Sequence, residues 1–519
     1  MTEKYYLRVA TFHDLKEPGD RFLYRFFEML PGFLLWGTFF LAVLLSWLAP
    51  FVVAFFIIAF DLYWLFRVIY FSVHLRAAYQ KMRLHEKIDW KNLLEELKPE
   101  QIKISNLKSW QEIYHLIVIP MFKEPWEVVR ELFLSLVNSD YPREKMIVVL
   151  SYEEKAKIHG ERVALRIKEE FSDKFFKLAV FCHPANIPGE ISGKGSNETF
   201  AAIRAKEEII DKLPIAYERI IFSSFDADTV VLPKYFSCLT YHYLTCEKPL
   251  RTSYQPIPLY VNNLWQVPIF SRIFAFSSTF WHTLNQERPE KLVTFSSHSM
   301  SFQALVEVGF KQTNVVSDDS RIFWQCFLYF DGDYRVLPLY YPVSMDAIGA
   351  RSFWATLKNL YRQQRRWAFG VGEIPYVFFG FLKNKKIPFS RKLSLVSELL
   401  ESHWSWASAS FLIFFLGWLP LVLGSQKFSQ TILSYKLPQL TSLLMTFSMI
   451  GLLLTAFLSL KLLPPRPPDY GRHKYFVFVI QWLFLPLMML FFSALPAIDA
   501  QTRWLLGKYL GFWHTEKLR

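Results

Sequence analysis

The chain has 519 residues, of which 52% are hydrophobic and 18% aromatic, and it carries a formal net charge of +13. These apolar fractions exceed those of ordinary soluble proteins, so a wholly soluble globular chain is excluded and a membrane protein is expected. The basic residues flank apolar stretches or alternate with acids without forming a polybasic domain. This distribution excludes nucleic acid as a partner and favours the lipid bilayer.

The first 30 residues are polar to mixed, and we expect them to form a cytosolic N-terminal segment that is retained, because they are too long and too acidic for a signal peptide. Residues 31–74 contain two apolar stretches, each long enough to cross a hydrocarbon core of about 30 Å. Basic residues such as Arg25 and Arg76 flank this pair. The positive-inside rule therefore places both flanks in the cytoplasm.

Residues 75–389 are expected to form a cytosolic α/β domain. A polar connector is followed by apolar strand patterns at 113–119, 145–150, 175–183, 218–225 and 252–261, and by helix patterns at 125–138, 153–171, 198–213, 267–284 and 321–330. Strands that alternate with helices are typical of a mostly parallel, Rossmann-like sheet. The small, polar stretch 294–302 is interpreted as a loop. The four cysteines, Cys182, Cys238, Cys246 and Cys326, have no paired spacing and no neighbouring histidines suited to zinc, so we expect reduced thiols.

Residues 390–498 are expected to contain about three transmembrane helices, with apolar stretches near 404–424, 440–463 and 475–495. The loop 461–474 is basic and is therefore placed inside, which makes the three spans run out, in and out. Three spans in this region would place the basic tail at 499–519 outside the cell. An interfacial stretch or a missed span would place the tail inside instead. The expected location is a multi-pass cell membrane, with the central domain in the cytoplasm.

Two carboxylates, Asp226 and Asp228, follow the strand pattern at 218–225. The carboxyl edge of a parallel sheet is where ligands bind in open α/β folds. An Asp-x-Asp pair there can bind a divalent ion with one acid and a ligand oxygen with the other. Asp is also a common turn residue after a strand, so the pair alone leaves both interpretations open.

Two further stretches each allow a structural and a chemical interpretation. Asp318 and Asp319 precede the helix at 321–330 and are either helix caps or, through one of them, a general base. The stretch 361–367, Tyr-Arg-Gln-Gln-Arg-Arg-Trp, is either a basic interfacial helix or a diphosphate site whose Trp offers a flat face to a sugar.

Two loops complete the candidate site. Lys194 lies in a glycine-bearing loop before a helix, where an anion can bind, although the spacing is not that of a Walker loop. Pro120 and Glu124 lie in the turn after the first strand, where a base or ribose sits in such folds.

Taken in this order, these residues resemble the family 2 glycosyltransferases of the GT-A fold, especially the membrane-embedded branch that includes cellulose and hyaluronan synthases. The resemblance covers roughly residues 110–370 by motif and the flanking apolar stretches by layout. It implies that Asp226 binds the nucleotide diphosphate, that Asp228 binds a Mg or Mn ion and that Asp319 is the catalytic base.

The resemblance also assigns the remaining candidates. In the Gln363–Trp367 motif it implies donor binding by Gln363 and Arg366 and acceptor binding by Trp367, with Asp318 also on the acceptor side. Pro120, Glu124 and Lys194 would contact the donor. The family usually has an Asp at the end of the second strand, and this chain has Glu153 and Glu154 instead. We expect Glu153 or Glu154 to do that work, with Glu153 as the named candidate, which leaves the nucleotide specificity open.

The function that the resemblance implies is an inverting hexosyl transfer from a nucleotide sugar to a growing polysaccharide at the membrane, and the expected donor is a UDP-sugar. One alternative is a single transfer to a lipid-linked acceptor. Another is a non-catalytic membrane scaffold with a degenerate transferase domain. The expected partners are the donor, a glycan or lipid-linked acceptor and the bilayer.

Overall fold

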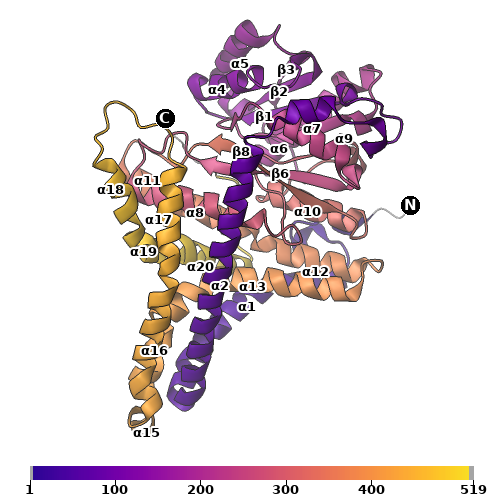
Figure 1. Ribbon diagram of the computed structural model, residues 1–519. Coiled ribbons are helices and arrows are strands. Elements are labelled where there is room, and N and C mark those ends of the chain that lie inside the picture. The colour runs from indigo at the N-terminus through magenta and orange to yellow at the C-terminus, as the bar shows by residue number, and fades with distance from the viewer. Residues whose placement is uncertain (1–3, 514–519) are drawn as a thin grey trace.

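The computed structural model describes residues 4–513, so that part of the expected C-terminal tail, residues 514–519, lies outside the described residues. An α/β domain forms the upper part of the molecule, and long apolar helices project from its base (Figure 1).

One eight-stranded sheet organises the upper domain, in the order β3-β2-β1-β4-β7-β6-β8-β5. The first four strands in this order are parallel: β1 (Tyr114–Met121), β2 (Met146–Glu153), β3 (Lys177–His183) and β4 (Ile220–Ser224). β6 (Thr252–Tyr260) and β8 (Arg335–Met345) are parallel to each other. The predicted class, a mostly parallel α/β sheet combined with long apolar helices, is confirmed.

Two short antiparallel strands complete the sheet, one between these two groups and one at its edge. β7 (Ser299–Ser301) lies between β4 and β6, and β5 (Val230–Val231) pairs with β8. The stretch 294–302, expected as a loop, therefore contains a strand. The serines of this strand are polar and so give no apolar pattern in the sequence. They are buried because their hydroxyls pair with other hydroxyls: Ser299 Oγ lies 2.7 Å from Ser223 Oγ and 3.1 Å from Tyr235 Oη.

Helices cover both faces of the sheet. Ile117 and Ile119 of β1 face one core with helices α4 (Trp126–Val137), α5 (Lys157–Phe171) and α7 (Tyr235–Thr245). Leu116 and Val118 face the opposite core with α6 (Lys194–Glu208), α9 (Phe302–Glu307) and α10 (Asp318–Tyr329). Burial on both faces explains why these strands are continuously apolar.

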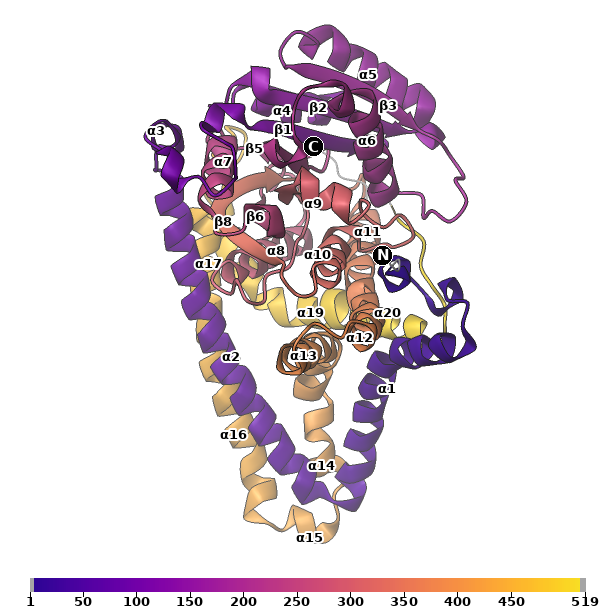
Figure 2. The ribbon, with the colours of Figure 1, turned by 90° about the vertical axis from the view of Figure 1, so that its right-hand side faces the viewer.

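Among residues 4–513, four helical stretches are long and apolar enough to cross a membrane, and a pair of helices bent by 47° is a candidate for a fifth span. Two are α1 (Pro18–Leu48) and α2 (Pro50–His85), which form a V (Figure 2). The bent pair consists of α13 (Phe389–Phe414) and α14 (Leu419–Leu423). The short helix α15 (Gln426–Ser429) follows at the lower tip of the molecule. From there α16 (Ile432–Ser448) and α17 (Ile450–Lys461) run back upward beside α2.

The last apolar stretch lies differently from the third C-terminal span that the sequence suggested. It comprises α18 (Lys474–Ile480), α19 (Leu485–Met489) and α20 (Leu495–Leu505), and α19 and α20 run across the base of the α/β domain (Figure 2). Arg365 Nη1 pairs with Asp499 Oδ2 at 2.9 Å, and the Trp504 ring stacks on Phe369. These contacts hold the end of the described chain against the α/β domain. The expected out, in, out order of the three spans stays a prediction.

Candidate active site

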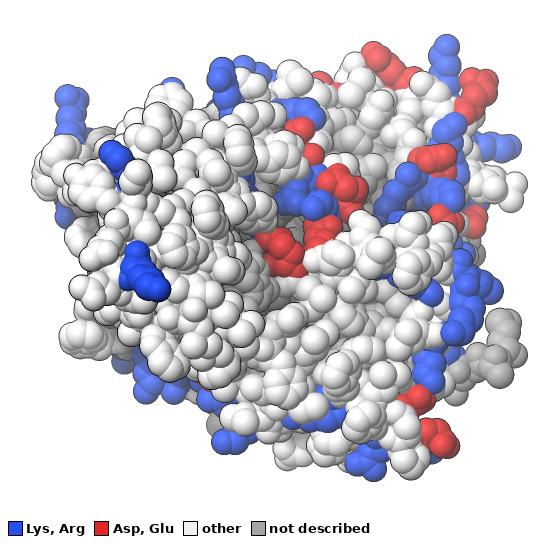
Figure 3. Space-filling model, turned by 90° about the horizontal axis from the view of Figure 1, so that it is seen from below, with Lys and Arg blue, Asp and Glu red and all other residues white. Residues whose placement is uncertain are grey.

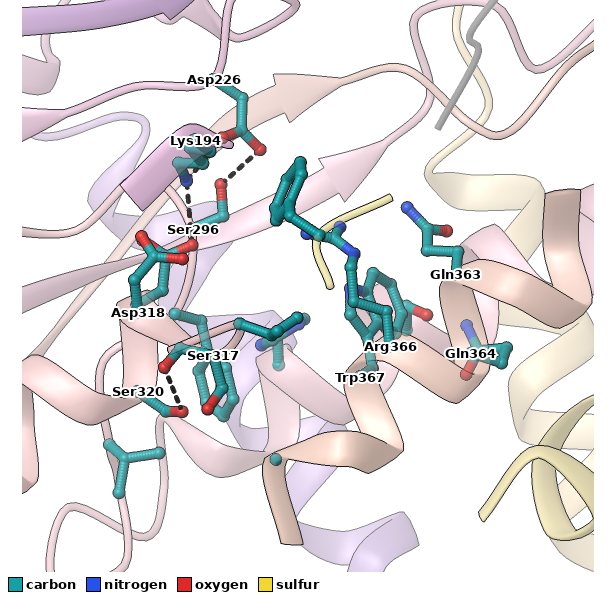
Figure 4. Close-up of a pocket in the computed structure, with 18 of the residues that line it drawn as sticks. Lys194, Asp226, Ser296, Ser317, Asp318, Ser320, Gln363, Gln364, Arg366 and Trp367 are labelled. Atoms are coloured by element: carbon teal, nitrogen blue, oxygen red, sulfur yellow. Dashed lines mark hydrogen bonds and ion pairs between the residues drawn. The ribbon is translucent and has the colours of Figure 1, made fainter. Parts of the chain in front are cut away.

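All eleven residues that the sequence singled out line one cavity of 1910 Å³. They come from strand ends, helix starts and the long helix α11 (Phe353–Ala368): Pro120, Glu124, Glu153, Lys194, Asp226, Asp228, Asp318, Asp319, Gln363, Arg366 and Trp367. Figure 4 shows Lys194, Asp226 and Asp318 on one side of the cavity and Gln363, Arg366 and Trp367 on the other.

Lys194 joins two of the acids that are far apart in sequence. Its Nζ lies 2.6 Å from Asp226 Oδ1 and 2.9 Å from Asp319 Oδ2. Burial alone would lower the pKa of Lys194, but these carboxylates raise it well above its ordinary value. Ser296 Oγ donates to Asp226 Oδ2 at 2.7 Å (Figure 4). The start of α6 therefore holds a permanent cation between the strand-edge acid and the acid of the next motif.

Close backbone packing makes this arrangement possible. A Cβ at Gly195 would lie 2.7 Å from the Cβ of Asp318, closer than real Cβ contacts. Glycine at this position therefore lets the first turn of α6 approach the start of α10, and no larger residue fits without a shift of one of them.

Lys311 forms a second cationic centre behind Asp319. Its Nζ lies 2.8 Å from Glu198 Oε1, 3.2 Å from Asp319 Oδ1 and 3.7 Å from Asp318 Oδ2. Burial alone would raise the pKa of Asp319, but Lys194 and Lys311 hold it well below its ordinary value. Glu198, Asp318 and Asp319 lie close enough together to hold a metal ion. Lys311 already supplies the positive charge there.

Asp318 differs from its neighbour in burial and in proton affinity. Its side chain is 5% exposed, compared with 22% for Asp319. Burial and the adjacent charge of Asp319 raise the pKa of Asp318 to about 7. Asp319 is thus the acid that reaches the cavity as a carboxylate, and Asp318 holds a proton below neutral pH.

Replacing Asp318 by Asn is expected to change stability in a pH-dependent way. Because the folded-state pKa of about 7 exceeds the unfolded value of about 4, wild-type stability falls between these values as pH rises. The Asn variant should therefore gain in unfolding temperature relative to wild type from about pH 4 to about pH 7, with a constant difference above that range. A difference independent of pH would contradict the raised pKa.

Arg366 and Trp367 face these acids from α11. The Arg366 Nε is buried and has no hydrogen-bond partner among residues 4–513, so the guanidinium has unused capacity for an anion. The centroid of the Phe512 ring lies 4.8 Å from Arg366 Cζ. A Cβ at Gly193 would lie 2.4 Å from Cγ of the same ring. Phe512 therefore packs against both elements that the sequence predicts to bind an anion. Trp367 packs against Tyr260 and Phe274 at the wall of the cavity.

Asp228 is the candidate metal ligand. It is 5% exposed, and its Oδ2 accepts the backbone N–H of Asp346 at 2.9 Å. The carboxylates of Asp226, Asp228 and Asp346 all line the cavity, and such hard oxygen atoms suit Mg²⁺ or Mn²⁺. The residues present therefore fit the divalent ion that the resemblance implies.

The remaining donor candidates lie along the carboxyl edge of the sheet. Glu153 is the last residue of β2 and lies 3.4 Å from His183 Nδ1 of the neighbouring strand β3. Glu124 accepts the backbone N–H of Phe122 at 2.7 Å and shapes the turn after β1. Glu153 thus occupies the strand end where the family usually has an Asp.

Sequence reasoning missed a buried network that positions the acid loop. Arg321 Nε pairs with Glu373 Oε2 at 2.9 Å, and both side chains are almost fully buried. Glu373 Oε1 accepts the hydroxyls of Ser317, at 2.8 Å, and of Ser320, at 3.3 Å. Ser317 and Ser320 bracket Asp318 and Asp319, so Glu373 fixes this loop. No local pattern marks Glu373, because its partners lie more than 50 residues away.

The cavity continues from the acids toward the apolar helices. Trp64 and Arg67 of α2, His403 and Trp406 of α13 and Ser493 line its lower part. Seen from below, the mostly uncharged surface has a hollow in which acidic and basic side chains are visible (Figure 3). The site is therefore open toward the region between the apolar helices.

No protein-family model and no curated protein matches this chain. Among solved structures, a mannosyltransferase from Pyrobaculum calidifontis, in complex with GDP-Man and Mn²⁺, is 13% identical, with 76% of this chain and 99% of that chain covered and a TM-score of 0.39. TarS of S. aureus is 12% identical over 65% of this chain and 54% of that chain, with a TM-score of 0.33. GalNAc-T7 with UDP, GalNAc and Mn²⁺ is 11% identical over 58% and 59%, with a TM-score of 0.32. The fold assignment rests on the chain's own sheet order.

Proposed function

We propose that this protein is a membrane-bound inverting glycosyltransferase that takes a sugar from a nucleotide-sugar donor, with a UDP-sugar as the proposed donor. The observation that carries the proposal is the convergence of Asp226, Asp228, Asp319 and Arg366 on one cavity at the carboxyl edge of a parallel sheet. In this proposal the α/β domain faces the cytoplasm, and α1, α2, the bent pair and the α16–α17 helix cross the bilayer.

The reaction follows from the charges around the cavity. The acceptor hydroxyl oxygen attacks the anomeric carbon while its proton passes to the carboxylate of Asp319. The bond between the anomeric carbon and the diphosphate oxygen breaks, and its electron pair stays on the diphosphate. Arg366 and Lys194 supply fixed positive charge to those oxygens. A divalent ion held by Asp228 and Asp226, when bound, neutralises part of the same charge.

Lys194 links donor binding to the strength of the base. In the structure its ammonium holds the pKa of Asp319 low, which makes that carboxylate a poor proton acceptor. A diphosphate competes for the same ammonium, and movement of Lys194 toward it would raise the pKa of Asp319. The base would therefore be strengthened only when the donor is present.

Replacing Lys194 by Met is expected to weaken UDP binding roughly 10- to 100-fold, because a charged hydrogen bond contributes about 1.5–3 kcal/mol. Isothermal titration with UDP and Mg²⁺ measures the change. Lys206→Met on the same helix is the matched control, since Lys206 pairs with Asp211 at the surface. Equal UDP affinity in both variants would remove Lys194 from the donor site.

We propose a growing polysaccharide as the acceptor, and the continuation of the cavity between α2 and α13 supports delivery of acceptor or product along the membrane. The same opening also suits a lipid-linked acceptor that receives one sugar.

A screen of radiolabelled UDP- and GDP-sugars with Mg²⁺ and Mn²⁺ on the purified protein, followed by product sizing, tests the function. Long products support the synthase. Products extended by one sugar support the single-transfer alternative. Neither transfer nor hydrolysis with any donor would refute enzymatic activity and support the scaffold alternative.

A further inference from the structure

A second cluster of metal-ligating side chains lies outside the cavity, where the upper end of α2 meets α7 and β8 (Figure 2). It consists of His85 from α2 and Cys238 and His242 from α7. One ring nitrogen from each histidine and the Sγ of Cys238 all lie within 4.8 Å of one another. The three ligand atoms therefore need only a small adjustment to reach bonding distances of about 2.0–2.3 Å from one ion.

The hydrogen bonds around the cluster leave lone pairs for an ion. His85 Nδ1 lies 2.9 Å from the backbone carbonyl of Leu339, so this nitrogen donates its proton and Nε2 carries the free lone pair. Metal-binding histidines usually make such an outer hydrogen bond, which fixes the ring and its tautomer. His242 Nε2 is buried and has no hydrogen-bond partner among the described residues.

The surroundings also suit a neutral nitrogen and sulfur ligand set. The two imidazole rings lie nearly parallel, at 14°, with centroids 6.1 Å apart. The lone pair of His242 Nε2, which no hydrogen bond among the described residues uses, therefore remains available to a cation. Cys238 is fully buried, whereas both histidines are partly exposed, which gives an ion and one water ligand a route in.

We propose that His85, Cys238 and His242 form a zinc site that fastens the end of the membrane helix α2 to the α/β domain. Two imidazoles and a thiolate with one open position favour Zn²⁺ over Mg²⁺ or Ca²⁺, which prefer oxygen ligands. On binding, the zinc–sulfur bond forms and the thiol proton of Cys238 leaves to solvent. The proposal departs from the expectation that none of the four cysteines has histidines suited to zinc, because His242 lies one helical turn from Cys238 and the fold brings His85 to the pair.

The test uses the full-length protein in detergent, stripped with a chelator, in an Asp228→Asn background that removes the proposed donor-site metal ligand. Zn²⁺ is measured as retained equivalents after desalting, and Co²⁺ serves as a spectroscopic probe. We expect one retained equivalent of Zn²⁺ and a Co²⁺–thiolate charge-transfer band. Cys238→Ser should abolish the band, and His85→Gln and His242→Gln should each weaken Zn²⁺ binding roughly tenfold or more.

Cys246→Ser is the matched control, because Cys246 follows the same helix but lies outside the cluster. It should bind Zn²⁺ as the parent does. His85→Gln keeps the test decisive if Cys238→Ser fails to fold, since His85 is partly exposed and His85→Gln leaves the buried thiol in place. Equal Zn²⁺ retention in parent and His85→Gln, or a folded parent without the thiolate band, would overturn the proposal.

Discussion

Replacing Asp319 by Asn is expected to lower the rate of sugar transfer roughly 10²- to 10⁴-fold, the usual contribution of a general base. Asn keeps the shape of the side chain and removes the proton acceptor. Donor affinity should remain or increase, because the change frees Lys194 from one of its two carboxylate partners and removes negative charge beside the diphosphate. Initial rates with labelled donor and titration with UDP measure the two effects separately.

Asp333→Asn is the control for this prediction, since Asp333 pairs with Lys248 at the surface and does not line the cavity. It should transfer sugar at the wild-type rate. Near-normal turnover of Asp319→Asn would show that another group accepts the proton. A loss of UDP binding as large as the loss of rate would show that Asp319 acts through the donor site.

Replacing Glu373 by Leu is expected to destabilise the protein by about 3–5 kcal/mol, the usual cost of leaving one buried charge without its partner. The guanidinium of Arg321 would remain buried beside Tyr376, with backbone carbonyls and Gln312 as its remaining hydrogen-bond acceptors. The Ser317 and Ser320 hydroxyls would also lose their acceptor. Chemical unfolding in detergent measures the stability, and labelled transfer measures the effect on the Asp318–Asp319 loop.

Two comparisons make the Glu373 result specific. Glu247→Leu breaks an exposed pair with Arg335 and should change stability little. The double variant Arg321→Met with Glu373→Leu removes both charges and should recover much of the loss, because an apolar pair often replaces a buried ion pair at little cost. Similar destabilisation by Glu247→Leu and Glu373→Leu would contradict a special role for the buried pair.

Local sequence pattern was sufficient to predict the four parallel strands β1 to β4 and also β6, but it did not predict β8, the parallel partner of β6. Continuous apolar runs identify strands that are buried on both faces, as β1, β2 and β4 are. Parallel strands end at one edge, so residues that follow different strands, such as Glu124 and Asp226, lie along the same cavity. The short strand β7 escaped prediction because its serines satisfy their hydrogen bonds with distant hydroxyls and have no alternating apolar pattern.

The sequence by itself therefore determined the α/β class, the apolar helices and the identity of the residues around the cavity, because hydrophobic period and motif order are local properties. Only the tertiary structure decided which charges meet: Lys194 with Asp226 and Asp319, Arg321 with Glu373, and Asp499 with Arg365. The two members of each of these ion pairs are 32 to 134 residues apart in the sequence. The burial that shifts their pKa values depends on how whole helices and strands pack. The placement of the last apolar stretch is likewise proposed from packing, since the stretch Lys474–Leu505 is apolar enough to span a membrane but its last helix, α20, is held against α11 by the Arg365–Asp499 ion pair.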